Sequence, residues 1–467
     1  MTIAEDIIRG REPDYDHYIR QGETLDDIDE FGFTPLIESI ITRQPAITEE
    51  LLSRGVLVDK PDVTGRTALH WAVDNGDKAL IKLLFKHKAN PNTYTSAGMS
   101  CLVYPVLRDQ ADIKRMLYKH GARVDFAQDF IQAKLLGHRF ELSGTVDIVS
   151  ADDQLIELNY EGFILEFTVA TVIDALRRFT SSYSTKSARA YFPFFHSLMD
   201  GFVLAEHFLK LQHPPKLNQD QWNEIEHMLH APLLILPAAS QGHAMGFARY
   251  HQFWVKVDRG ENALKEGSVN IYRITQPNAI NLNFIRAFLY QKQPRSFFHE
   301  TINQQLGLMP IAQLPIPPQI TGNCSWANIQ ALIPSVFAMM RLFDEREFDA
   351  NEALRLYEQW LEWDKDRALD DCIHRFYHAN RLRKASIASI LGGVLFQACN
   401  YDKSHHLERA EKILTILNEG EYQYILRSYI HHYCEKRLTP RGNNLLKVLE
   451  DCGVNSGIDV HPVARDR

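Results

Sequence analysis

The sequence predicts a multidomain α+β protein with three parts: an N-terminal α-helical repeat solenoid, a central α+β domain with a small antiparallel sheet, and a C-terminal α-helical cap. Three patterns support this. A 33-residue period marks residues 1–141, short apolar runs alternate with turns in 142–345, and apolar residues recur at helical spacing in 346–467. A chain of 467 residues has room for several domains.

The composition excludes several classes of protein. A hydrophobic share of 45% with 24% charged residues is typical of a folded chain, and a net charge of -8 argues against direct nucleic-acid binding. No apolar run approaches the ~18 residues that span a bilayer, so we expect no membrane span and no Sec-type signal. Six cysteines without a CxxC pair predict free thiols in a reducing compartment.

The first part repeats a glycine, a hydroxyl residue and a leucine at a fixed step. Gly32-Phe33-Thr34-Pro35-Leu36 recurs 33 residues later from Gly65 and again from Gly98. The segment Thr67-Ala68-Leu69-His70-Trp71-Ala72 resembles the ankyrin consensus T-P-L-H-x-A. We therefore expect units at 30–62, 63–95 and 96–128, an N-terminal cap, and a possible last half repeat near 130–140.

The ankyrin resemblance implies a module that binds a protein partner. Glycine supplies the positive φ of each hairpin, and Thr34, Thr67 and Ser100 are expected to cap the helices that follow. Six residues are expected to contact the partner: Phe33, Arg66, His70, Trp71, Met99 and Tyr104.

The central part holds apolar segments that predict three strands, at 240–248, 253–260 and 269–274. A hairpin turning at Tyr250-His251 pairs residues whose numbers sum to 501, which places His243 opposite Asp258. Directly opposed side chains have Cβ atoms about 4.5 to 5.5 Å apart, close enough for the imidazole to donate to the carboxylate. The turn lacks glycine and asparagine, and a slip of one residue would separate the pair.

A cysteine follows a segment that must be extended. Prolines disfavour helix in residues 315–322, and a helix is expected to begin near Cys324. A thiol at a helix N-terminus has a lowered pKa, which favours the nucleophilic thiolate. A neighbouring imidazolium would lower the pKa further.

The segment Asn323-Cys324-Ser325-Trp326 resembles the nucleophile region of papain-like cysteine peptidases. The chain order here is His, Asp, Cys, whereas the family runs Cys, His, Asn, so the order would be permuted. The resemblance implies a triad of Cys324, His243 and Asp258. It also implies an oxyanion or cleft set, to which we assign Gln319, Gln241, Asn323, Trp326 and Trp254.

Other interpretations of these residues stay open. Cys324 at a helix start is also compatible with a degraded pocket or with ordinary packing, and the same chemistry would serve deamidation or acyl transfer. In the C-terminal part, Cys372, His374 and His378 share a helix face but lack the glutamate of HExxH. We therefore expect no metal site and no cofactor. Arg381, Arg383 and Lys384 are expected to form a solvated helix face.

The combination of a short ankyrin array, a permuted papain-like segment and a helical tail is similar to the Dot/Icm type IV secreted ankyrin-repeat effectors of Legionella, of the AnkH type. The resemblance implies delivery into a eukaryotic host cell, where the repeats bind a host protein. Two functions follow as hypotheses: a host-directed cysteine protease or related thiol hydrolase, or a non-catalytic binding scaffold with a vestigial pocket. The C-terminus, Val463–Arg467, lacks the glutamate-rich stretch of many such effectors.

Overall fold

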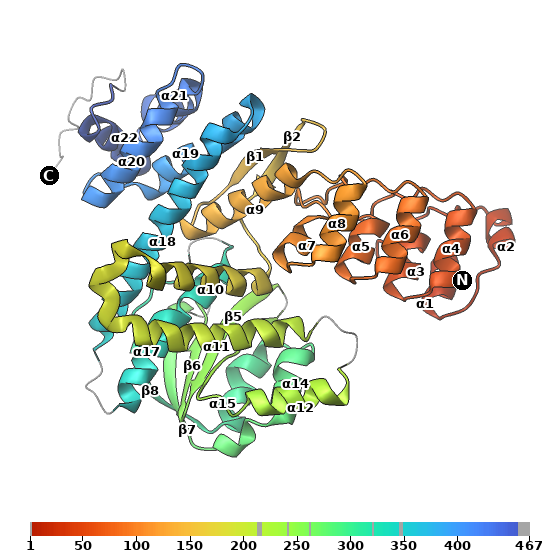
Figure 1. Ribbon diagram of the computed structural model, residues 1–467, viewed down its shortest axis with the longest axis horizontal. Helices are drawn as coiled ribbons and strands as arrows, with labels where there is room; N and C mark the ends of the chain where they lie inside the picture. Colours follow the sequence, from red (N-terminus) through yellow and green to blue (C-terminus); the bar gives the residue numbers. More distant parts are fainter. Residues whose placement is uncertain are drawn as a thin grey trace. The chain divides into compact units, whose positions relative to one another are not determined.

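The computed structural model describes residues 2–212, 217–240, 242–260, 263–319, 322–344 and 349–455. The chain divides into two compact units, and Figure 1 labels their elements. The first unit comprises Met1–Ala133, Thr145–Asn159 and Ala379–Ile387, and the second comprises Lys134–Gly144, Tyr160–His378 and Ala388–Arg467. These divisions differ from the expected domain boundaries at 141/142 and 345/346. The C-terminal residues Val463–Arg467 lie outside the described ranges.

Short antiparallel helix pairs make up most of the first unit, as the 33-residue period predicts. The cap before the first repeat is itself a pair of short helices. The helices are α1 (Ile3–Ile8), α2 (Tyr15–Arg20), α3 (Pro35–Ile41), α4 (Pro45–Ser53), α5 (Ala68–Asp74), α6 (Lys78–Lys86), α7 (Val103–Leu107), α8 (Ala111–Lys119) and α9 (Val124–Arg139).

The repeat turns show why glycine recurs. Gly65 has a φ of +81°, and a Cβ there would lie 2.6 Å from the backbone nitrogen of Ser96, so a side chain is excluded by conformation and by space. Thr34 caps α3 by accepting the N–H of Ile37 at 3.2 Å, as expected.

The third repeat departs from the expected cap at Ser100. Helix α7 starts at Val103, and the Ser100 hydroxyl is buried without a hydrogen-bond partner. Pro105 explains the late start, because its ring and missing N–H are tolerated only in the first turn of a helix.

A two-stranded hairpin completes the first unit. Strands β1 (Thr145–Val149) and β2 (Leu155–Asn159) pair antiparallel, with Ile148 opposite Ile156. Arg383 donates twice to Asp129, at 2.6 Å each, and the Asp129 side chain is only 8% exposed. Arg383 therefore belongs to an ion pair and not to a solvated face, which corrects the expectation for this residue.

The second unit is built around an antiparallel sheet in the order β3-β5-β6-β7-β8, with β4 paired to β5. The strands are β3 (Leu233–Ile235), β4 (Ala238–Ser240), β5 (His243–Tyr250), β6 (Phe253–Val257), β7 (Val269–Ile274) and β8 (Leu308–Leu314). All pairings are antiparallel, and the expected strand at 269–274 is present as β7. The segment expected as one strand at 240–248 is divided between the end of β4 and most of β5, and the strand expected at 253–260 ends at Val257.

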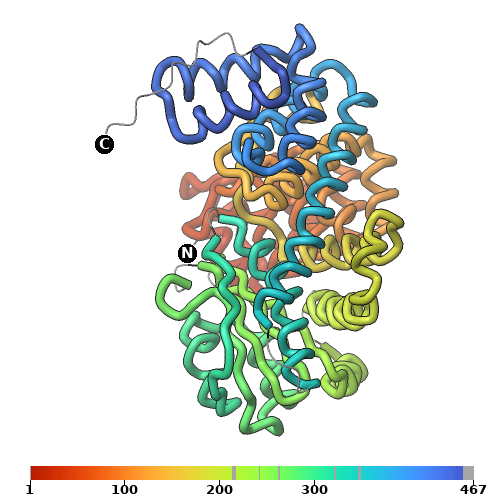
Figure 2. The backbone as a smooth tube through the Cα atoms, turned by 90° about the vertical axis from the view of Figure 1, so that its left-hand side faces the viewer, coloured from red at the N-terminus to blue at the C-terminus, as the bar shows by residue number. Residues whose placement is uncertain are grey.

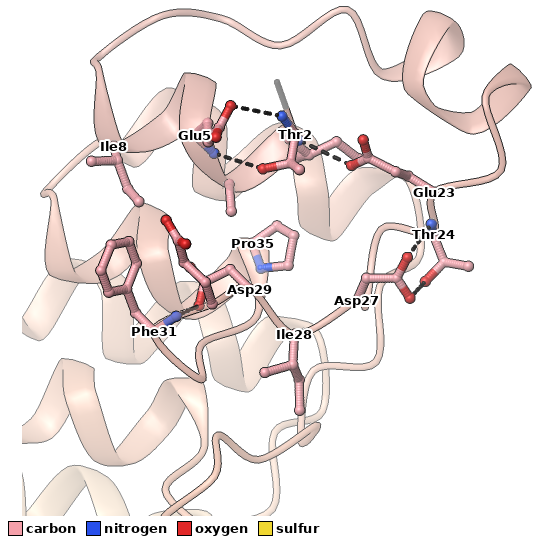
Figure 3. A pocket seen from close by; sticks show the side chains of 13 residues that line it. Thr2, Glu5, Ile8, Glu23, Thr24, Asp27, Ile28, Asp29, Phe31 and Pro35 are labelled. Carbon is pink, nitrogen blue, oxygen red and sulfur yellow. Dashed lines mark hydrogen bonds between the residues drawn. The ribbon is translucent and has the colours of Figure 1, made fainter.

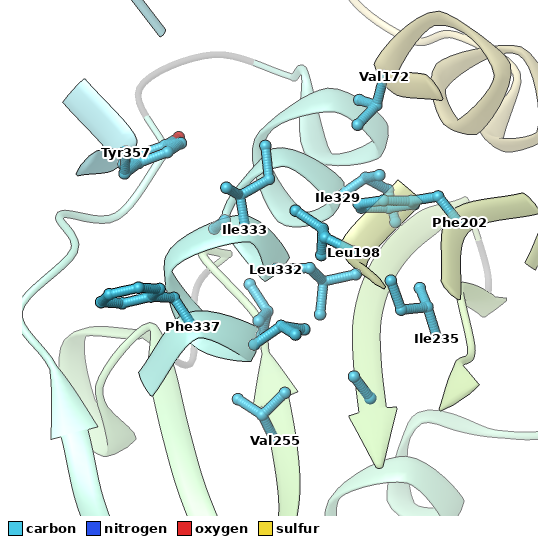
Figure 4. Packing of buried hydrophobic residues seen from close by; sticks show 14 of the residues in the cluster. Val172, Leu198, Phe202, Ile235, Val255, Ile329, Leu332, Ile333, Phe337 and Tyr357 are labelled. Carbon is cyan, nitrogen blue, oxygen red and sulfur yellow. The ribbon is translucent and has the colours of Figure 1, made fainter. Parts of the chain in front are cut away.

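Helices cover both faces of the sheet, because successive strand residues point to opposite sides. One core joins Ala248 and Val255 to helices that include Leu198 and Leu332, and Figure 4 shows this packing. The other core joins Phe247 and Trp254 to Phe288. The first face takes α10 (Leu165–Ser181), α11 (Phe192–Lys210), α16 (Cys324–Gln330) and α17 (Leu332–Phe343); the second takes α12 (Gln219–Met228), α14 (Leu282–Tyr290), the π-helical turn η3 (Phe297–Thr301) and α15 (Ile302–Gln305).

From residue 349 the described chain is almost wholly helical, as expected. Its first helix is not separate from the sheet, since Leu356 and Trp360 of α18 (Ala350–His378) belong to the same core as the sheet residues. Figure 2 shows α18 leading from the sheet to the helices that follow. These are α19 (Arg381–Ala398), α20 (Ser404–Leu417), α21 (Gln423–Ile430) and α22 (Pro440–Asp451). None of the helices in the described ranges is long and apolar enough to cross a membrane.

Candidate active site

Cys324 is the first residue of α16, where the sequence places it. Helix α16 packs closely against β5 because Gly246 has no side chain: a Cβ there would lie 2.8 Å from the carbonyl oxygen of Asn328. The backbone N–H of Ala244 donates to the Cys324 sulfur at 3.4 Å. The strand that holds His243 therefore reaches the thiol directly.

His243 and Asp258 are in contact, although the predicted register is wrong by two residues. The observed pairs, such as Gly246 with Val257, sum to 503 and not to 501, and the turn is His251-Gln252, with His251 at a φ of +50°. A shift of two keeps both side chains on the same face, because side chains alternate with a period of two. Nε2 of His243 lies 2.8 Å from Oδ1 of Asp258.

The three groups shift one another's pKa. Hydrogen bonds to Asp258 and to Cys324 raise the pKa of His243 to about 9, against the effect of its burial. Burial opposes ionisation of Asp258, but hydrogen bonds from His243, His299 and the Gly260 N–H hold the pKa of its carboxyl well below the usual range. Burial also opposes the Cys324 thiolate, yet the bonds from His243, Ala244 and Ser325 lower its pKa. A thiolate–imidazolium pair is therefore favoured near neutral pH.

His299 is a neighbour of the triad that sequence reasoning missed. It lies on η3, with Nε2 3.4 Å from Oδ2 of Asp258 and Nδ1 3.3 Å from Nζ of Lys256. Lys256 is buried and bonds the carboxylate of Glu266 at 2.9 Å. The Asp258 carboxylate is thus flanked by two imidazoles. No local pattern marks His299, because it lies 41 residues beyond Asp258 in sequence.

Two further residues fix the loops around the triad. Asn328 is fully buried on α16; its Oδ1 accepts the N–H of Arg259 at 2.7 Å, and its Nδ2 donates to the Ala244 carbonyl at 2.6 Å. It therefore ties α16 to both segments that carry the other two triad members. Gly260 touches the imidazole edge, and a Cβ there would lie 2.7 Å from Cε1 of His243.

The residues expected to form the oxyanion hole and the cleft differ in their burial and hydrogen bonding. Asn323 directly precedes Cys324; it is 2% exposed, and neither of its side-chain amide atoms has a hydrogen-bond partner. Gln319 bonds the Arg259 carbonyl through its backbone N–H, while its Oε1 has no partner. Gln241 lies outside the described residues.

Neither tryptophan fits the expected lining of an open cleft. Trp326 is 1% exposed and packs beneath the guanidinium of Arg139 at 4.9 Å. Trp254 is fully buried against Phe247 and Phe288 in the second core. Both expectations are wrong for the same reason: an aromatic residue beside a functional segment more often fills the core than a binding surface.

The remaining cysteines differ from Cys324 in their environment. Cys101, Cys372, Cys399 and Cys434 are buried, and Cys452 is half-buried like Cys324. Burial raises the pKa of Cys101 and Cys399 to about 12, and burial also raises the pKa of Cys452. The pKa of Cys324 is thus lowered, whereas burial raises the pKa of Cys101, Cys399 and Cys452.

The expected partner-binding residues of the ankyrin array gather in the first unit. The Phe33 and Trp71 rings meet edge-to-face at 5.7 Å, and the Arg66 guanidinium lies 3.9 Å above Trp71. Tyr104 lies beneath the Arg108 guanidinium at 4.7 Å. These side chains and that of Met99 are half-buried.

His70 does not belong to the exposed surface expected of it. It is 3% exposed, Nδ1 accepts the Thr67 N–H at 3.1 Å, and Nε2 lies 3.2 Å from the Met99 carbonyl. Burial lowers its pKa to about 4, so the ring is neutral at pH 7 and donates to that carbonyl. His70 links two repeats.

Within the described ranges, Glu362, His405 and His406 bring three potential metal ligands together. The Glu362 carboxylate already contacts two cations, with Arg409 Nη1 at 2.7 Å and Lys365 Nζ at 2.8 Å. His406 Nδ1 accepts the N–H of Asn400, which leaves the ring proton on the nitrogen that faces Glu362. The group is better described as an ion-pair network between α18 and α20.

Comparison with known proteins identifies the repeats. A family model described as ankyrin repeats (three copies) matches residues 15–95 and 57–128. Inversin of Gallus gallus is 32% identical over 100 residues, which cover 21% of this chain and 9% of inversin. Zygote-specific protein 3 of Chlamydomonas reinhardtii is 32% identical over 89 residues, 19% of this chain and 24% of that protein. The chain thus spans a quarter or less of these relatives, and the first unit is a protein-binding module.

One solved structure matches the whole chain. The structure titled as that of the Legionella effector AnkH is 61% identical, covers 99% of this chain and 100% of that chain, and superposes with a TM-score of 0.82. The likeness extends over both units, well beyond the repeats.

Proposed function

The chain belongs to the family of the Legionella effector AnkH, and from this premise we propose an effector that binds a host protein through its ankyrin repeats and acts on a protein as a cysteine-dependent hydrolase. In this proposal a bacterial type IV system delivers it into the host cell. The observation that supports catalysis best is the hydrogen-bonded series Cys324, His243, Asp258, with a lowered thiol pKa and a raised imidazole pKa.

The first chemical step forms a thioester. The Cys324 thiolate attacks the carbonyl carbon of a peptide or isopeptide bond, and a C–S bond forms as the carbonyl oxygen takes the negative charge. We assign the backbone N–H of Cys324 and the side-chain amide of Asn323 as the donors to that oxygen, because both groups adjoin the Cys324 thiol in the sequence. The C–N bond then breaks, and His243 gives its proton to the leaving nitrogen.

The second step restores the thiolate. Water gives a proton to His243 and its oxygen bonds the thioester carbon; the C–S bond breaks, releasing the acid and regenerating the thiolate–imidazolium pair. Asp258 stays ionised and orients His243 throughout. A glutamine side chain as substrate would give deamidation, and an amine in place of water would give acyl transfer, so the chemistry of the site is common to all three.

Proteomics of host peptide termini tests the proposal. Host-cell lysate is incubated with the native protein, with Cys324→Ala, and with Cys452→Ala as a matched control that removes the other half-buried thiol. New termini should form with the native protein and with Cys452→Ala, and should be absent with Cys324→Ala. Glutamine-to-glutamate conversion and new amide links are read from the same peptides.

Identical profiles of peptide termini for all three proteins would contradict proteolysis. The absence of any Cys324-dependent change in the peptides would contradict every form of the proposed hydrolase. The binding function of the repeats does not depend on that outcome. In that case the half-buried row of Phe33, Arg66, Trp71 and Tyr104 would act alone, as a scaffold for a host protein.

A further inference from the structure

The negative charge of the chain is concentrated at its N-terminal end. Residues 1–35 contain ten Asp and Glu, three Arg and no Lys, which gives -7 of the total charge of -8. The remaining 432 residues are therefore almost neutral. Charge placed so unevenly creates a local field that attracts cations from solution.

Part of this charge surrounds a cavity of about 330 Å³ between α1, the segment that follows α2, and the start of α3. Figure 3 shows Ile8 and Phe31 together at one end of the cavity and Glu23 and Asp27 at the other. The cavity is lined by Thr2, Ile3, Ala4, Glu5, Ile8, Glu23, Thr24, Asp27, Ile28, Asp29, Glu30, Phe31 and Pro35, and no Lys, Arg or His is among them.

The apolar part of the cavity is open to solvent. Ile8 is 40% exposed, Ile28 44% and Phe31 59%. Each of these three large apolar side chains therefore lines the cavity and is also accessible to a molecule that enters it. A volume of this size falls at the lower end of the range for ligand pockets, about 300 to 1,000 Å³.

The carboxylates at the rim of the cavity accept hydrogen bonds from N–H and O–H groups and remain charged. Glu23 accepts the Ile3 N–H at 3.1 Å, and Asp27 accepts the N–H and hydroxyl of Thr24 at 2.8 and 2.6 Å. In the described part of the chain, Glu23, Asp27, Asp29 and Glu30 have no ion pair with a basic side chain. The bonds fix the carboxylates of Glu23 and Asp27 in position without neutralising them, and Lys60 is a basic side chain close enough to help lower the pKa of Asp27.

A buried acid, Glu38, interacts with Asp29, one of the carboxylates that line the cavity. Glu38 of α3 is 4% exposed, and burial together with the charge of Asp29 raises its pKa to about 7. Asp29 itself lines the cavity and is held by the N–H groups of Phe31 and Phe33, at 2.9 and 2.8 Å. A cation that entered here would relieve repulsion already present in the folded chain.

We propose that this cavity is a docking site for a basic peptide segment of a partner protein, with an apolar side chain inserted between Ile8, Ile28 and Phe31 and flanking Lys or Arg side chains on the carboxylates. Charge complementarity selects this occupant: an acidic peptide would be repelled, and an apolar peptide would leave the rim uncompensated. The site lies at the N-terminal end of the array, next to Phe33 in the chain, and does not include Cys324.

Fluorescence anisotropy with the full chain tests the proposal. The probe is a fluorescein-labelled nonapeptide, Gly-Ser-Lys-Arg-Leu-Lys-Arg-Ser-Gly, and saturable binding that weakens with added salt is expected. The double variant Glu23→Gln/Glu30→Gln should raise Kd about threefold to tenfold at low salt, because it removes two exposed charge pairs with the peptide. Phe31→Ala should raise it about fivefold. Glu49→Gln, on the exposed face of α4, and Leu264→Ala, 83% exposed in the second unit, should leave it unchanged.

Three outcomes would overturn the proposal. The first is no saturable binding of the peptide up to millimolar concentration. The second is equal Kd values for the pocket variants and their controls, with thermal denaturation showing all of them folded. The third is that spermine, or the same peptide with Ser in place of Leu, binds as tightly as the probe, because the cavity would then act only as a polyanion.

Discussion

The Cys324 thiol should react with iodoacetamide faster than the other half-buried cysteine, Cys452. Bonds from His243 and Ala244 lower the pKa of Cys324, whereas burial raises that of Cys452. Each pKa unit changes the thiolate fraction about tenfold below the pKa, so we expect a rate ratio of about ten or more at pH 7. Mass spectrometry of each modified peptide over time measures the two rates.

Asp258→Asn is the informative variant in the same assay, because it removes the largest cause of the raised His243 pKa. The imidazolium would then form less readily, and labelling of Cys324 should slow while that of Cys452 stays unchanged. Equal and slow labelling of both thiols in the native protein would contradict the poised pair and leave Cys324 as an ordinary packed residue.

The triad also predicts how stability depends on pH. The folded pKa of His243 is about 9, above the ordinary 6.5, so its stabilising contribution is complete below about pH 6.5 and is lost as pH rises toward 9. The lowered pKa of Cys324 acts in the opposite sense, since its contribution grows as pH rises. Removing the thiol with Cys324→Ser should therefore make stability fall more steeply with pH than in the native chain.

Thermal denaturation between about pH 6.5 and 9.5 measures this difference. The reference is the double variant His243→Gln/Cys324→Ser, which lacks both titrating groups. The Tm of Cys324→Ser relative to that reference should decrease with rising pH. A constant or increasing difference would show that His243 does not hold its proton in the folded state.

At the residue scale, the sequence predicted contacts between neighbouring elements but not contacts that depend on the tertiary fold. His243 and Asp258 were found because His243 begins β5 and Asp258 directly follows β6, the neighbouring strand, and a register error of two residues keeps both side chains on one face. His299 was missed because it meets the site only through the tertiary fold, and Asn328 was missed because its contacts with Arg259 and Ala244 are tertiary, although it lies one turn after Cys324 on α16. The two tryptophans were misplaced because burial is not visible in a local motif.

At the scale of elements, the loop that follows β6 determines how closely the imidazole can approach its partners. Gly260 does not have a left-handed φ, so Ala is compatible with its backbone, but a Cβ would lie 2.7 Å from Cε1 of His243 and 3.0 Å from Oδ1 of Asp258. Gly260→Ala should displace the ring and slow both Cys324 labelling and any Cys324-dependent cleavage, by about tenfold to 100-fold.

Gly420→Ala is the matched control for that variant, since its Cβ would meet no atom within 4 Å. Both proteins should fold, which far-ultraviolet circular dichroism checks, and only Gly260→Ala should lose reactivity. Unchanged labelling of Gly260→Ala would show that the ring position does not depend on this loop.

Helix and strand placement was largely predictable because periodicity is local. Helix α16 begins at Cys324, as the sequence predicts, and the glycines at 392 and 393 lie inside an unbroken α19. Gly392 serves packing there, as a Cβ would lie 2.8 Å from Cγ2 of Ile425. The start of α7 was misjudged because the proline moved it by two residues, from the position after Ser100 to Val103.

At the scale of the molecule, the order of segments along the chain did not reveal which segments belong to which compact unit. Thr145–Asn159 and Ala379–Ile387 both belong to the first unit, although sequence assigned them to the central and C-terminal parts. The ion pair between Asp129 and Arg383 joins residues 254 apart, and no periodic signal reports such a contact. Contacts between residues far apart in sequence determine which fragments of the chain can fold stably.

A fragment that ends at residue 141, the boundary expected from sequence, should be less stable than one that ends at 159. The longer fragment keeps the β1–β2 hairpin, whose Ile156 and Leu158 lie 3.5 and 3.8 Å from the Cβ position of Gly98 in the third repeat. Ile148 and Leu158 are fully buried, and burying a side chain of this size stabilises by about 1.5 to 3 kcal/mol. The longer fragment should therefore be more stable by several kcal/mol, which urea denaturation followed by circular dichroism measures.

Two leucines of β2 provide the control within the longer fragment. Leu158→Ser should remove most of the gain, because the side chain has no exposed surface, whereas Leu155→Ser, at a position 55% exposed, should be nearly neutral. Equal effects of the two substitutions, or equal stability of the 141 and 159 fragments, would mean that the hairpin does not stabilise the array. The difference between the two leucines is the sharper test, because it separates specific packing against the third repeat from a general effect of fragment length.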